Sequence, residues 1–395
     1  MTKQAVILAG GRGSRLGALT AQTPKPLLPC GDRPFLLHLI ENLARFGFRD
    51  QILLVGPYEA IFREALSDVE SRFKVSLTLV SEPEPAGTAG ALLWARERLA
   101  ERFLMLNGDC LFDFNYLDMT SASAESSEEI ARLALRPLKE TGRFGTVLLD
   151  GDRILEFSEK AGGGEGVING GVYWMRRKAL DEIARTPCSI ERDVFPALAM
   201  RGALRGSVYH GEFLDIGTPD DFARVEDVLE RWRYRPAVFF DRDGVLNLDS
   251  GYVCRPEEFV WVEGASEAIK DLNDRGFLVF VVTNQSGVAR GYYDAPTVER
   301  LHGWMNEQLA THGAHIDRFY YCPHPATEPI SCGCRKPAPG MIMQALGEWP
   351  IRRAGSFMVG DKETDVAAAA AAGVPGYLFS GGNLSAFIKA KCLFE

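Results

Sequence analysis

AVILAGGRGSRLG, at residues 5–17, joins a short apolar run to a glycine-rich turn and decides the fold class of the first half of the chain. Such a run predicts a buried strand, and glycines directly after it let backbone N–H groups approach an anion. Further strands are expected at 51–56, 75–80 and 103–109, and helices at 34–47 and 89–103. This alternation predicts a parallel sheet covered on both faces by helices.

The same pattern restarts at AVFFDRDG, residues 237–244, directly after the helical stretch 219–232 and the segment RYRP. Strands are then expected at 277–285, 319–323 and 356–361. The chain therefore belongs to the α/β class, with two Rossmann-like domains at 1–234 and 235–395. A length of 395 residues agrees with two domains.

Composition narrows the function classes. Hydrophobic residues make up 46% and charged residues 25%, which is the balance of a globular protein. A net charge of −9 argues against a broad nucleic-acid surface. No apolar run approaches the ~20 residues of a membrane helix, and no signal peptide is visible, so we expect a cytoplasmic protein. The eight cysteines fit a reducing compartment.

The turn after the first strand is followed by TPKPLLP, residues 23–29, which holds Lys25 between two prolines. The spacing fits neither a P-loop nor the G-x-G-x-x-G fingerprint, because Leu16 occupies the third glycine position. A tight turn with surface arginines is one interpretation of the glycines. A rigid cation shortly after such a loop favours the other, a polyphosphate site.

The first half resembles the sugar-phosphate nucleotidyltransferase family over about residues 3–230. The resemblance rests on motifs in order, namely LAGGRGSRLG (8–17), TPKPLLP (23–29), EPAGTAGAL (84–92), LNGD (106–109), FSEK (157–160), NGGVYWM (169–175) and FLDIGTP (213–219). It implies transfer of a nucleotidyl group to a sugar 1-phosphate with release of pyrophosphate. No hexapeptide-repeat tail follows, which excludes the acyltransferase-bearing relatives.

The resemblance also implies roles for individual residues. Asp109 and Asp215 would hold Mg²⁺, while Arg15 and Lys25 would neutralise the triphosphate. Each aspartate is also compatible with a helix cap or a turn. Ala161 stands where the family often has proline after the FSEK lysine. The nucleotide would contact Leu8, Gly10, Gly11, Gly13, Gly87 and Thr88, and the sugar phosphate Glu159, Lys160 and Asn169.

In the second half, VFFDRDGVL at 238–246 places Asp241 and Asp243 just past a strand. Residues i and i+2 of an extended segment point the same way, so one carboxylate can attack phosphorus while the other protonates the leaving oxygen. Calcium loops and turns also show D-x-D. VVTNQSG (281–287), CRKP (334–337) and MVGDKETD (358–365) follow in order. The whole set resembles the haloacid-dehalogenase phosphatase superfamily over about residues 237–390.

That resemblance implies Asp241 as the nucleophile and Asp243 as the general acid and base. Thr283 and Lys336 would bind the transferring phosphoryl group. Mg²⁺ would be held by Asp241, by the backbone carbonyl of Asp243 and by Asp361, whereas Asp365 would steady the following helix. Asn284, Arg290, Arg335 and residues 249–252 would lie around the substrate.

Between the expected strands stand Cys322 and His324, then Cys332 and Cys334. Four nitrogen and sulfur ligands in one short loop predict a tetrahedral structural Zn²⁺ site, and free buried cysteines are the alternative. Such a site would fix the loop that carries Lys336. This subgroup resembles D-glycero-D-manno-heptose 1,7-bisphosphate 7-phosphatases and, among its near relatives, histidinol-phosphate phosphatases.

The two halves make sense as consecutive steps. The phosphatase would remove the 7-phosphate of heptose 1,7-bisphosphate, and the other domain would transfer GMP from GTP to the 1-phosphate, as the resemblance to bacterial heptose 1-phosphate guanylyltransferases implies. The alternatives are another sugar such as mannose 1-phosphate, a histidinol-phosphate phosphatase, or one domain that only binds sugar nucleotides. The expected partners are small-molecule substrates, and we expect binding neither to nucleic acid nor to a membrane. The sequence is compatible with a homo-oligomer.

Overall fold

The computed structural model describes residues 3–11, 13–122, 128–142, 144–158, 164–326 and 332–392. The chain divides into two compact units. The N-terminal unit comprises the chain up to Phe114 together with Ala122–Glu230, and the C-terminal unit comprises Asn115–Ser121 and the chain from Arg231 onward. The division falls inside helix α8 (Val225–Arg233), close to the expected boundary after residue 234. Inclusion of Asn115–Ser121 in the C-terminal unit was not expected.

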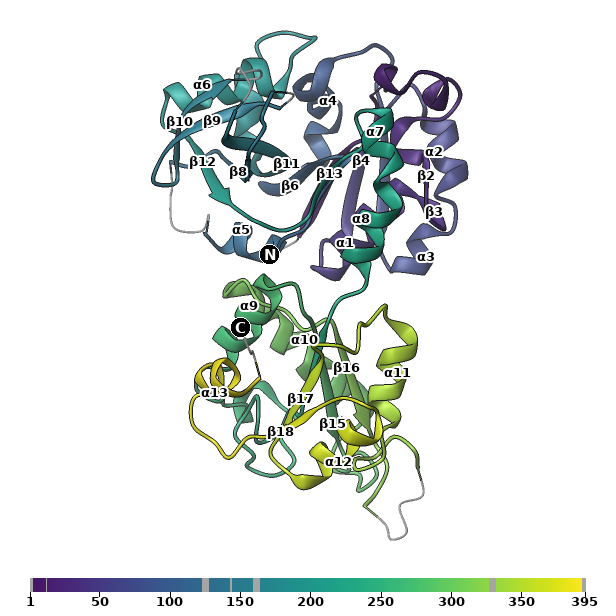
Figure 1. Ribbon diagram of the computed structural model, residues 1–395, viewed down its shortest axis with the longest axis vertical. Helices are drawn as coiled ribbons and strands as arrows, with labels where there is room; N and C mark the ends of the chain where they lie inside the picture. The colour runs from purple at the N-terminus through teal and green to yellow at the C-terminus, as the bar shows by residue number, and fades with distance from the viewer. Residues whose placement is uncertain are drawn as a thin grey trace. The chain divides into compact units, whose positions relative to one another are not determined.

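The N-terminal unit is built on a nine-stranded sheet in the order β5-β4-β1-β6-β11-β8-β12-β10-β9, as far as the described residues show (Figure 1). Its strands are β1 (Gln4–Leu8), β4 (Asp50–Gly56), β5 (Ser76–Ser81), β6 (Arg102–Asn107), β8 (Ala131–Leu138), β9 (Thr146–Asp150), β10 (Arg153–Ser158), β11 (Gly166–Arg176) and β12 (Leu204–Val208). Two-stranded pairings join β2 (Pro29–Cys30) to β3 (Arg33–Pro34), and β7 (Cys110–Phe112) to β13 (Phe213–Asp215).

The predicted parallel sheet is correct for β5, β4, β1 and β6, which pair in parallel. It is wrong for most pairs in the second half of the sheet, which is mixed: β11 runs antiparallel to both β6 and β8, whereas β12 pairs in parallel with β8. The long strand β11 had no helix before it in the sequence pattern, and a strand that returns without a crossover helix pairs antiparallel. The four parallel strands end at one edge, which is where the glycine loop after β1 lies.

Helices and shorter helical turns connect the strands of this unit. They are η1 (Ser14–Thr20), η2 (Lys25–Leu27), α1 (Phe35–Arg45), α2 (Glu59–Ala65), α3 (Val69–Phe73), α4 (Gly87–Ala95), η3 (Arg96–Arg98), η4 (Arg177–Glu182), η5 (Ile190–Val194), α6 (Phe195–Met200), α7 (Pro219–Ala223) and α8. The helix expected over 89–103 was too long, since α4 ends at Ala95 and β6 begins at Arg102. The helix expected over 219–232 is divided into α7 and α8.

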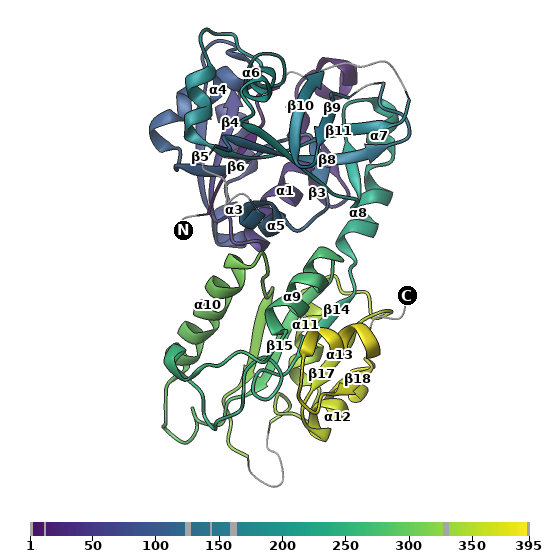
Figure 2. The same cartoon turned by 90° about the vertical axis from the view of Figure 1, so that its left-hand side faces the viewer.

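The C-terminal unit has a five-stranded parallel sheet, ordered β16-β15-β14-β17-β18 (Figure 2). The strands are β14 (Ala237–Phe240), β15 (Leu278–Asn284), β16 (Arg318–Cys322), β17 (Phe357–Gly360) and β18 (Gly376–Leu378). The helical elements are α5 (Tyr116–Ala122), η6 (Pro256–Glu258), α9 (Ala265–Asp274), α10 (Ala295–Thr311), α11 (Gly340–Glu348), α12 (Glu363–Ala371) and α13 (Leu384–Lys391).

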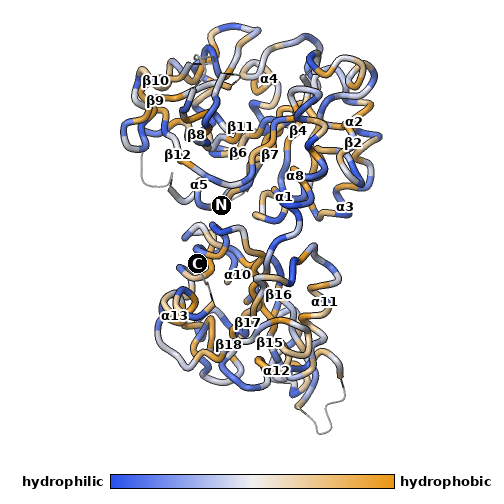
Figure 3. Tube along the Cα trace, in the orientation of Figure 1, coloured by the Kyte–Doolittle hydropathy of each residue, from blue (hydrophilic) through white to orange (hydrophobic). Residues whose placement is uncertain are grey.

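Both faces of this second sheet are buried. Val238 and Phe240 of β14 pack into one apolar cluster, whereas Ala237 and Phe239 pack into another. Successive side chains of a strand point to opposite faces, so the alternation shows that helices cover the sheet on both sides. The hydropathy colours of Figure 3 show the apolar stretches along the central strands. No helix among the described residues is long and apolar enough to cross a membrane.

Candidate active sites

Lys25, Asp109 and Asp215 lie together at the carboxyl edge of the N-terminal sheet. Lys25 begins η2 directly after Pro24, and its Nζ lies 2.6 Å from Oδ2 of Asp109 and 3.8 Å from Oδ1 of Asp215. Asp109 follows β6, and the antiparallel pairing of β7 with β13 sets Asp215 opposite Cys110. The structure thus brings together the two carboxylates and the lysine that the sequence singles out.

The electrostatics of this cluster favour a cation. Burial and the neighbouring Asp109 raise the pKa of the Asp215 carboxyl to about 6. Burial works against the charge of Lys25, but the two aspartates outweigh it and raise the pKa of its ammonium group. Oδ1 of Asp215 is buried and has no hydrogen-bond partner among the described residues. Two crowded carboxylates with a free oxygen fit a hard divalent cation such as Mg²⁺.

The cluster opens into a cavity of about 940 Å³. The close approach of two strand ends shapes it, because a Cβ on Gly10 would lie 2.6 Å from the backbone N of Gly56. Gly87 has a φ of +80°, and a Cβ there would meet Cys188 O at 2.4 Å. The lining includes Leu8, Gly11, Gly13, Arg15 and Thr88, all expected at the nucleotide. The volume is large enough for a nucleotide and part of a sugar.

Two residues that were expected to contact the substrate, Thr88 and Asn169, form hydrogen bonds within the protein. The Thr88 hydroxyl donates to Glu191 at 2.9 Å and accepts from the backbone N–H of Ile190. The Asn169 amide donates to the hydroxyl of Tyr173 at 2.9 Å, and its oxygen accepts from Gly171 N–H. Thr88 therefore holds Glu191 in the cavity wall, and Asn169 orients Tyr173. Asn169 is not among the residues that line this cavity. Glu159 and Lys160 lie outside the described residues.

Sequence reasoning missed two acidic residues that line this cavity, Glu82 and Glu191. Glu82 directly follows β5, which lies three strands away from β6, the strand that precedes Asp109. Burial raises the pKa of the Glu82 carboxyl. Its Oε2 accepts a hydrogen bond from Ala86 N–H at 3.4 Å. The strand order could have revealed Glu82, since each residue just past a parallel strand belongs to the same edge.

In the C-terminal unit, Asp241 follows β14 and Lys336 reaches it from a loop. Nζ of Lys336 lies 2.8 Å from Asp241 Oδ1 and 2.8 Å from Asp365 Oδ1. Burial raises the pKa of the Asp241 carboxyl to about 6, with Lys336 opposing that shift. Asp365 also accepts from the backbone N–H of Lys362 at the start of α12, as its expected capping role requires. It thus both caps the helix and holds the lysine.

Carboxylate oxygens of Asp241, Asp361 and Asp365 lie within 4.8 Å of one another and form a group that can hold a metal ion. Oδ1 of Asp361 is buried without a hydrogen-bond partner among the described residues. Burial raises the pKa of this carboxyl. A crowded set of carboxylates with an unpartnered oxygen again fits Mg²⁺. The sequence had placed Asp241 and Asp361 in such a group, but not Asp365.

Asp243 is held by three neighbouring side chains. Arg242 donates to both carboxylate oxygens at 2.9 Å, Asn247 to Oδ1 at 3.0 Å, and Gln285 to Oδ2 at 2.9 Å. Gln285 also donates to Thr283 Oγ1, so Asp243 and Thr283 share one contact. Asn284 exchanges two hydrogen bonds with the backbone of Lys336, which makes it a support for the lysine loop.

Of the residues expected around the phosphatase substrate, Arg290 and residues 249–252 lie on exposed loops, whereas Asn284 ends β15 and Arg335 is partly buried. The guanidinium of Arg290 lies 5.9 Å from the ring centre of Tyr252, which packs edge-to-face on Tyr292 at 4.8 Å. Arg335 donates to the backbone O of His324. Tyr292 and Tyr293 line a second cavity of about 590 Å³ with Cys254, Arg255, Val288, Gly291, Asp294, Ala295 and Thr297. Arg290 and Tyr252 are not among its lining residues.

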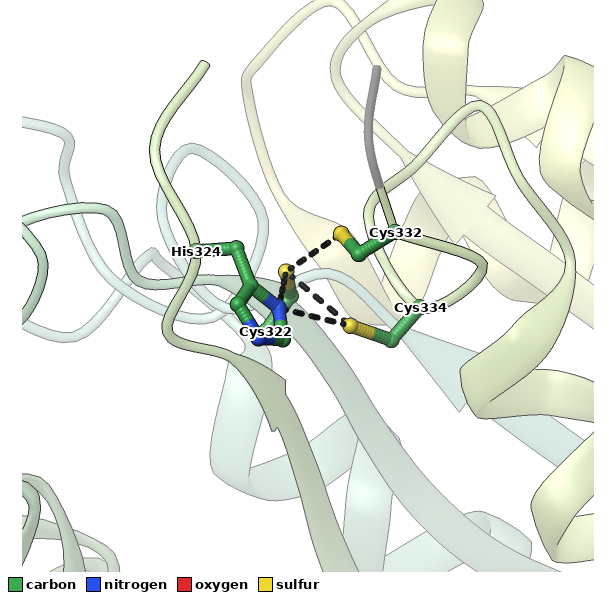
Figure 4. A group of neighbouring side chains, drawn as sticks. All are labelled: Cys322, His324, Cys332 and Cys334. Carbon is green, nitrogen blue, oxygen red and sulfur yellow. Dashed lines mark hydrogen bonds between the residues drawn. The ribbon is translucent and has the colours of Figure 1, made fainter. Parts of the chain in front are cut away.

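The predicted Cys/His group does converge (Figure 4). Sγ of Cys322 lies 3.7 Å from Sγ of Cys332 and 3.2 Å from Sγ of Cys334, and Nδ1 of His324 lies 3.2 Å from Cys334 Sγ. A tetrahedron with metal–sulfur bonds of about 2.3 Å has edges of about 3.8 Å. The four side chains can therefore hold one metal ion, and none of them forms a disulfide.

Comparison with known proteins supports the family resemblance of each half of the chain. The family model for nucleotidyl transferases matches residues 4–231, and a HAD-hydrolase-like model matches residues 333–387. The D-glycero-beta-D-manno-heptose-1,7-bisphosphate 7-phosphatase of Rhodopseudomonas palustris is 45% identical over 160 residues, which is 39% of this chain and 89% of that protein.

Two further proteins are similar to the N-terminal unit. A probable mannose-1-phosphate guanylyltransferase of Oryza sativa subsp. japonica is 34% identical over 226 residues, which is 55% of this chain and 62% of that protein. The crystal structure of HddC from Yersinia pseudotuberculosis superposes with a TM-score of 0.51 at 27% identity, and covers 57% of this chain and 99% of that one. HddC has also been solved in complex with GMP-PN.

Proposed function

Since this chain belongs to the nucleotidyl transferase family and carries a HAD-like phosphatase domain, we propose that it catalyses two consecutive steps on one heptose. The C-terminal domain removes the 7-phosphate of D-glycero-D-manno-heptose 1,7-bisphosphate. The N-terminal domain then transfers GMP from GTP to the heptose 1-phosphate, giving GDP-heptose and pyrophosphate. We place the boundary between these domains after residue 234.

We infer that the sugar is a heptose because two halves with related substrates occur in one chain. One half is 45% identical to a heptose bisphosphate phosphatase, whereas the other is similar to sugar 1-phosphate guanylyltransferases. Removal of the 7-phosphate leaves a sugar 1-phosphate, which is the class of acceptor that the second half needs. A histidinol-phosphate phosphatase would leave the N-terminal domain without a related reaction.

In the transferase site, Arg15 and Lys25 neutralise the triphosphate held by the glycine loop. Asp109 and Asp215 would hold Mg²⁺, which would supply electrostatic stabilisation of charge on the α-phosphate. Before substrate and metal bind, Lys25 keeps the two aspartates close together, because its Nζ lies 2.6 Å from a carboxylate oxygen of Asp109 and 3.8 Å from one of Asp215. Glu159, Lys160 and Asn169 bind the sugar phosphate.

Glu82 supports guanine as the base. The parallel strands place Asp109, the glycine loop, Gly56 and Glu82 in that order along one edge, and a spacing of about 4.8 Å per strand puts Glu82 about 14 Å from Asp109. A carboxylate only accepts hydrogen bonds. Guanine offers two adjacent donors, N1–H and the 2-amino group, whereas adenine, cytosine and uracil set an acceptor beside each donor.

In the phosphatase site, Asp241 attacks phosphorus and forms an aspartyl-phosphate. Asp243 protonates the leaving oxygen and then takes a proton from the hydrolytic water, while Thr283 and Lys336 bind the phosphoryl oxygens. Asp241, the backbone carbonyl of Asp243 and Asp361 would hold Mg²⁺, which would supply charge neutralisation. Zn²⁺ in the group Cys322, His324, Cys332 and Cys334 is structural: it fixes the loop that carries Arg335 and Lys336.

The test is incubation of the protein with heptose 1,7-bisphosphate, prepared as each anomer, and GTP, ITP, ATP or UTP, with products identified by mass. We expect phosphate release followed by GDP-heptose. Glu82→Gln should lower the ratio of the rate with GTP to the rate with ITP by about tenfold to a hundredfold, because the substitution removes a hydrogen bond to a charged group. Glu84→Gln, two residues away and exposed, is the matched control. A wild-type preference for another nucleotide would refute guanylyl transfer.

A further inference from the structure

Gln285 links two groups of the phosphatase site, the carboxyl of Asp243 and the hydroxyl of Thr283. It follows β15 and is 2% exposed. Its side-chain Nε2 donates to Oδ2 of Asp243 at 2.9 Å and to Oγ1 of Thr283 at 2.9 Å. One amide nitrogen thus bridges the expected proton donor and the expected phosphoryl-binding hydroxyl.

The orientation of this amide follows from its neighbours. The amide nitrogen can donate two hydrogen bonds, one to the Asp243 carboxyl and one to the Thr283 hydroxyl, whereas the amide oxygen can only accept, so the nitrogen faces these two groups. The amide oxygen then faces the other way, where it accepts from the Tyr293 hydroxyl at 2.8 Å. Both N–H bonds and the carbonyl oxygen of Gln285 are engaged, and the side chain has one arrangement that satisfies all of them.

The same contacts fix the direction of the Thr283 hydroxyl. Because its oxygen accepts from Gln285, its single hydrogen remains available for another acceptor. Thr283 is 1% exposed, and the acceptor that the proposed mechanism brings to this place is a phosphoryl oxygen. Gln285 therefore favours the hydroxyl rotamer that donates to the phosphoryl group over the one that donates to the amide.

Tyr293 holds the far side of the amide. A Cβ on Gly287 would lie 2.4 Å from the Tyr293 ring, so only glycine lets the ring reach this position. Burial raises the pKa of the Tyr293 hydroxyl to about 12, which keeps it a neutral donor. Since Tyr293 also lines the 590 Å³ cavity, the chain of contacts runs from that cavity through Gln285 to Asp243 and Thr283.

We propose that Gln285, held by Tyr293, is a positioning residue of the phosphatase: it sets Asp243 for proton transfer to the leaving group and Thr283 for donation to the phosphoryl oxygen. This inference rests on the proposed phosphatase activity. A proton is needed by an alkoxide leaving group, such as that of a sugar phosphate, and scarcely by 4-nitrophenolate. Loss of Gln285 should therefore slow the cleavage of a sugar phosphate more than that of an aryl phosphate.

The experiment compares heptose 1,7-bisphosphate with 4-nitrophenyl phosphate in the full-length protein. Gln285→Leu should lower kcat for the bisphosphate about a hundredfold with KM within about twofold, the scale of one acid–base contribution. The loss for 4-nitrophenyl phosphate should be about tenfold or less. Tyr293→Phe, which removes only one hydroxyl, should show the same split with smaller losses.

Gln308→Leu makes the same change at an exposed position of α10 and should leave both rates unchanged. Melting temperatures identify any variant that fails to fold, in which case Tyr293→Phe decides. Equal losses on the two substrates, or no loss, would overturn the positioning role while leaving the phosphatase intact. Wild-type protein that cleaves neither substrate would instead refute the proposed function.

Discussion

The two sites solve the same electrostatic problem with different burial. Each sets a lysine between two aspartates at the carboxyl edge of parallel strands, Lys25 in the N-terminal unit and Lys336 in the C-terminal unit. The side chains of Asp109 and Asp215 are 34% and 27% exposed, whereas those of Asp241 and Asp365 are 8% and 1% exposed. The first cluster is open to solvent and the second is closed.

This difference matches the chemistry proposed for each. A transferase must admit two large substrates and release two products, so its charged groups line a wide cavity. A phosphatase that forms a covalent intermediate gains from a nucleophile removed from bulk water, where the electrostatic effect of a nearby cation is stronger.

The two lysines are also positioned by different means. Pro24 and Pro26 flank Lys25 and restrict its backbone, so a local constraint is enough. Lys336 stands in a loop with no regular structure, two residues after Cys334 of the Cys/His group. Asn284 adds two hydrogen bonds to its backbone. The position of Lys336 therefore depends on contacts with residues distant in sequence. We expect the phosphatase activity to be more easily lost by substitution than the transferase activity.

The largest expected effect separates the two activities. Asp241→Asn should lower phosphate release by several orders of magnitude, because an amide cannot act as the nucleophile, and nucleotidyl transfer to supplied heptose 1-phosphate should persist. Asp109→Asn should do the reverse. Rates of phosphate and pyrophosphate release measure both. If either variant, correctly folded, lost both activities, the two-site interpretation would be wrong.

The next effect concerns the Cys/His group. Purified protein should contain close to one zinc per chain, and Cys332→Ser should lose it together with most of the phosphatase activity, while transferase activity survives. Metal analysis and the two assays test this. Cys392→Ser, a cysteine outside the group, should retain the metal. Active enzyme without bound metal would contradict the structural role.

Much of this arrangement could be predicted from the sequence because the motifs stand at strand ends, and parallel strands bring their ends to one edge. The motifs that resemble those of the two families singled out Lys25, Asp109 and Asp215, and Asp241 with Lys336. Sequence reasoning missed Glu191 and Gln285, since each is defined by a neighbour distant in sequence, Glu191 by Thr88 and Gln285 by Asp243. It also missed Glu82, although the strand order could have revealed that residue. The antiparallel pairings of β11 with β6 and β8 were missed because they too join segments distant in sequence.

A smaller effect concerns the order of the two reactions. Among the residues that the sequence predicts at the sugar phosphate, Glu159, Lys160 and Asn169, the cation is Lys160, and the 1-phosphate would occupy it. A second dianion at position 7 would lose hydration without a partner, so we expect heptose 1,7-bisphosphate to react at least about tenfold more slowly than the 1-phosphate. The Asp241→Asn variant, given the bisphosphate and GTP, allows the comparison. Nucleotide-linked heptose 7-phosphate formed at an equal rate would contradict the ordered scheme.

The smallest effect is on stability and uses Asp215. Its pKa of about 6 in the folded protein lies above the ordinary 3.8, so the folded state binds this proton more tightly than the unfolded state does. Without Mg²⁺, stability should therefore fall as pH rises from about 4 to 6 and stay lower above that range.

Asp215→Asn removes this cost while it removes a proposed metal ligand. In EDTA at pH 7.5 we expect the variant to be more stable by about 1–3 kcal/mol, which raises the melting temperature of the N-terminal unit by about 2–6 °C. At pH 4 the carboxyl is protonated in the folded wild type, and the difference should vanish. Asp220→Asn, an exposed aspartate at the start of α7, should give no such gain. A lower melting temperature for Asp215→Asn in EDTA would mean that its ion pair with Lys25 outweighs its repulsion by Asp109. The open site would then resemble the closed one in being held together by its lysine.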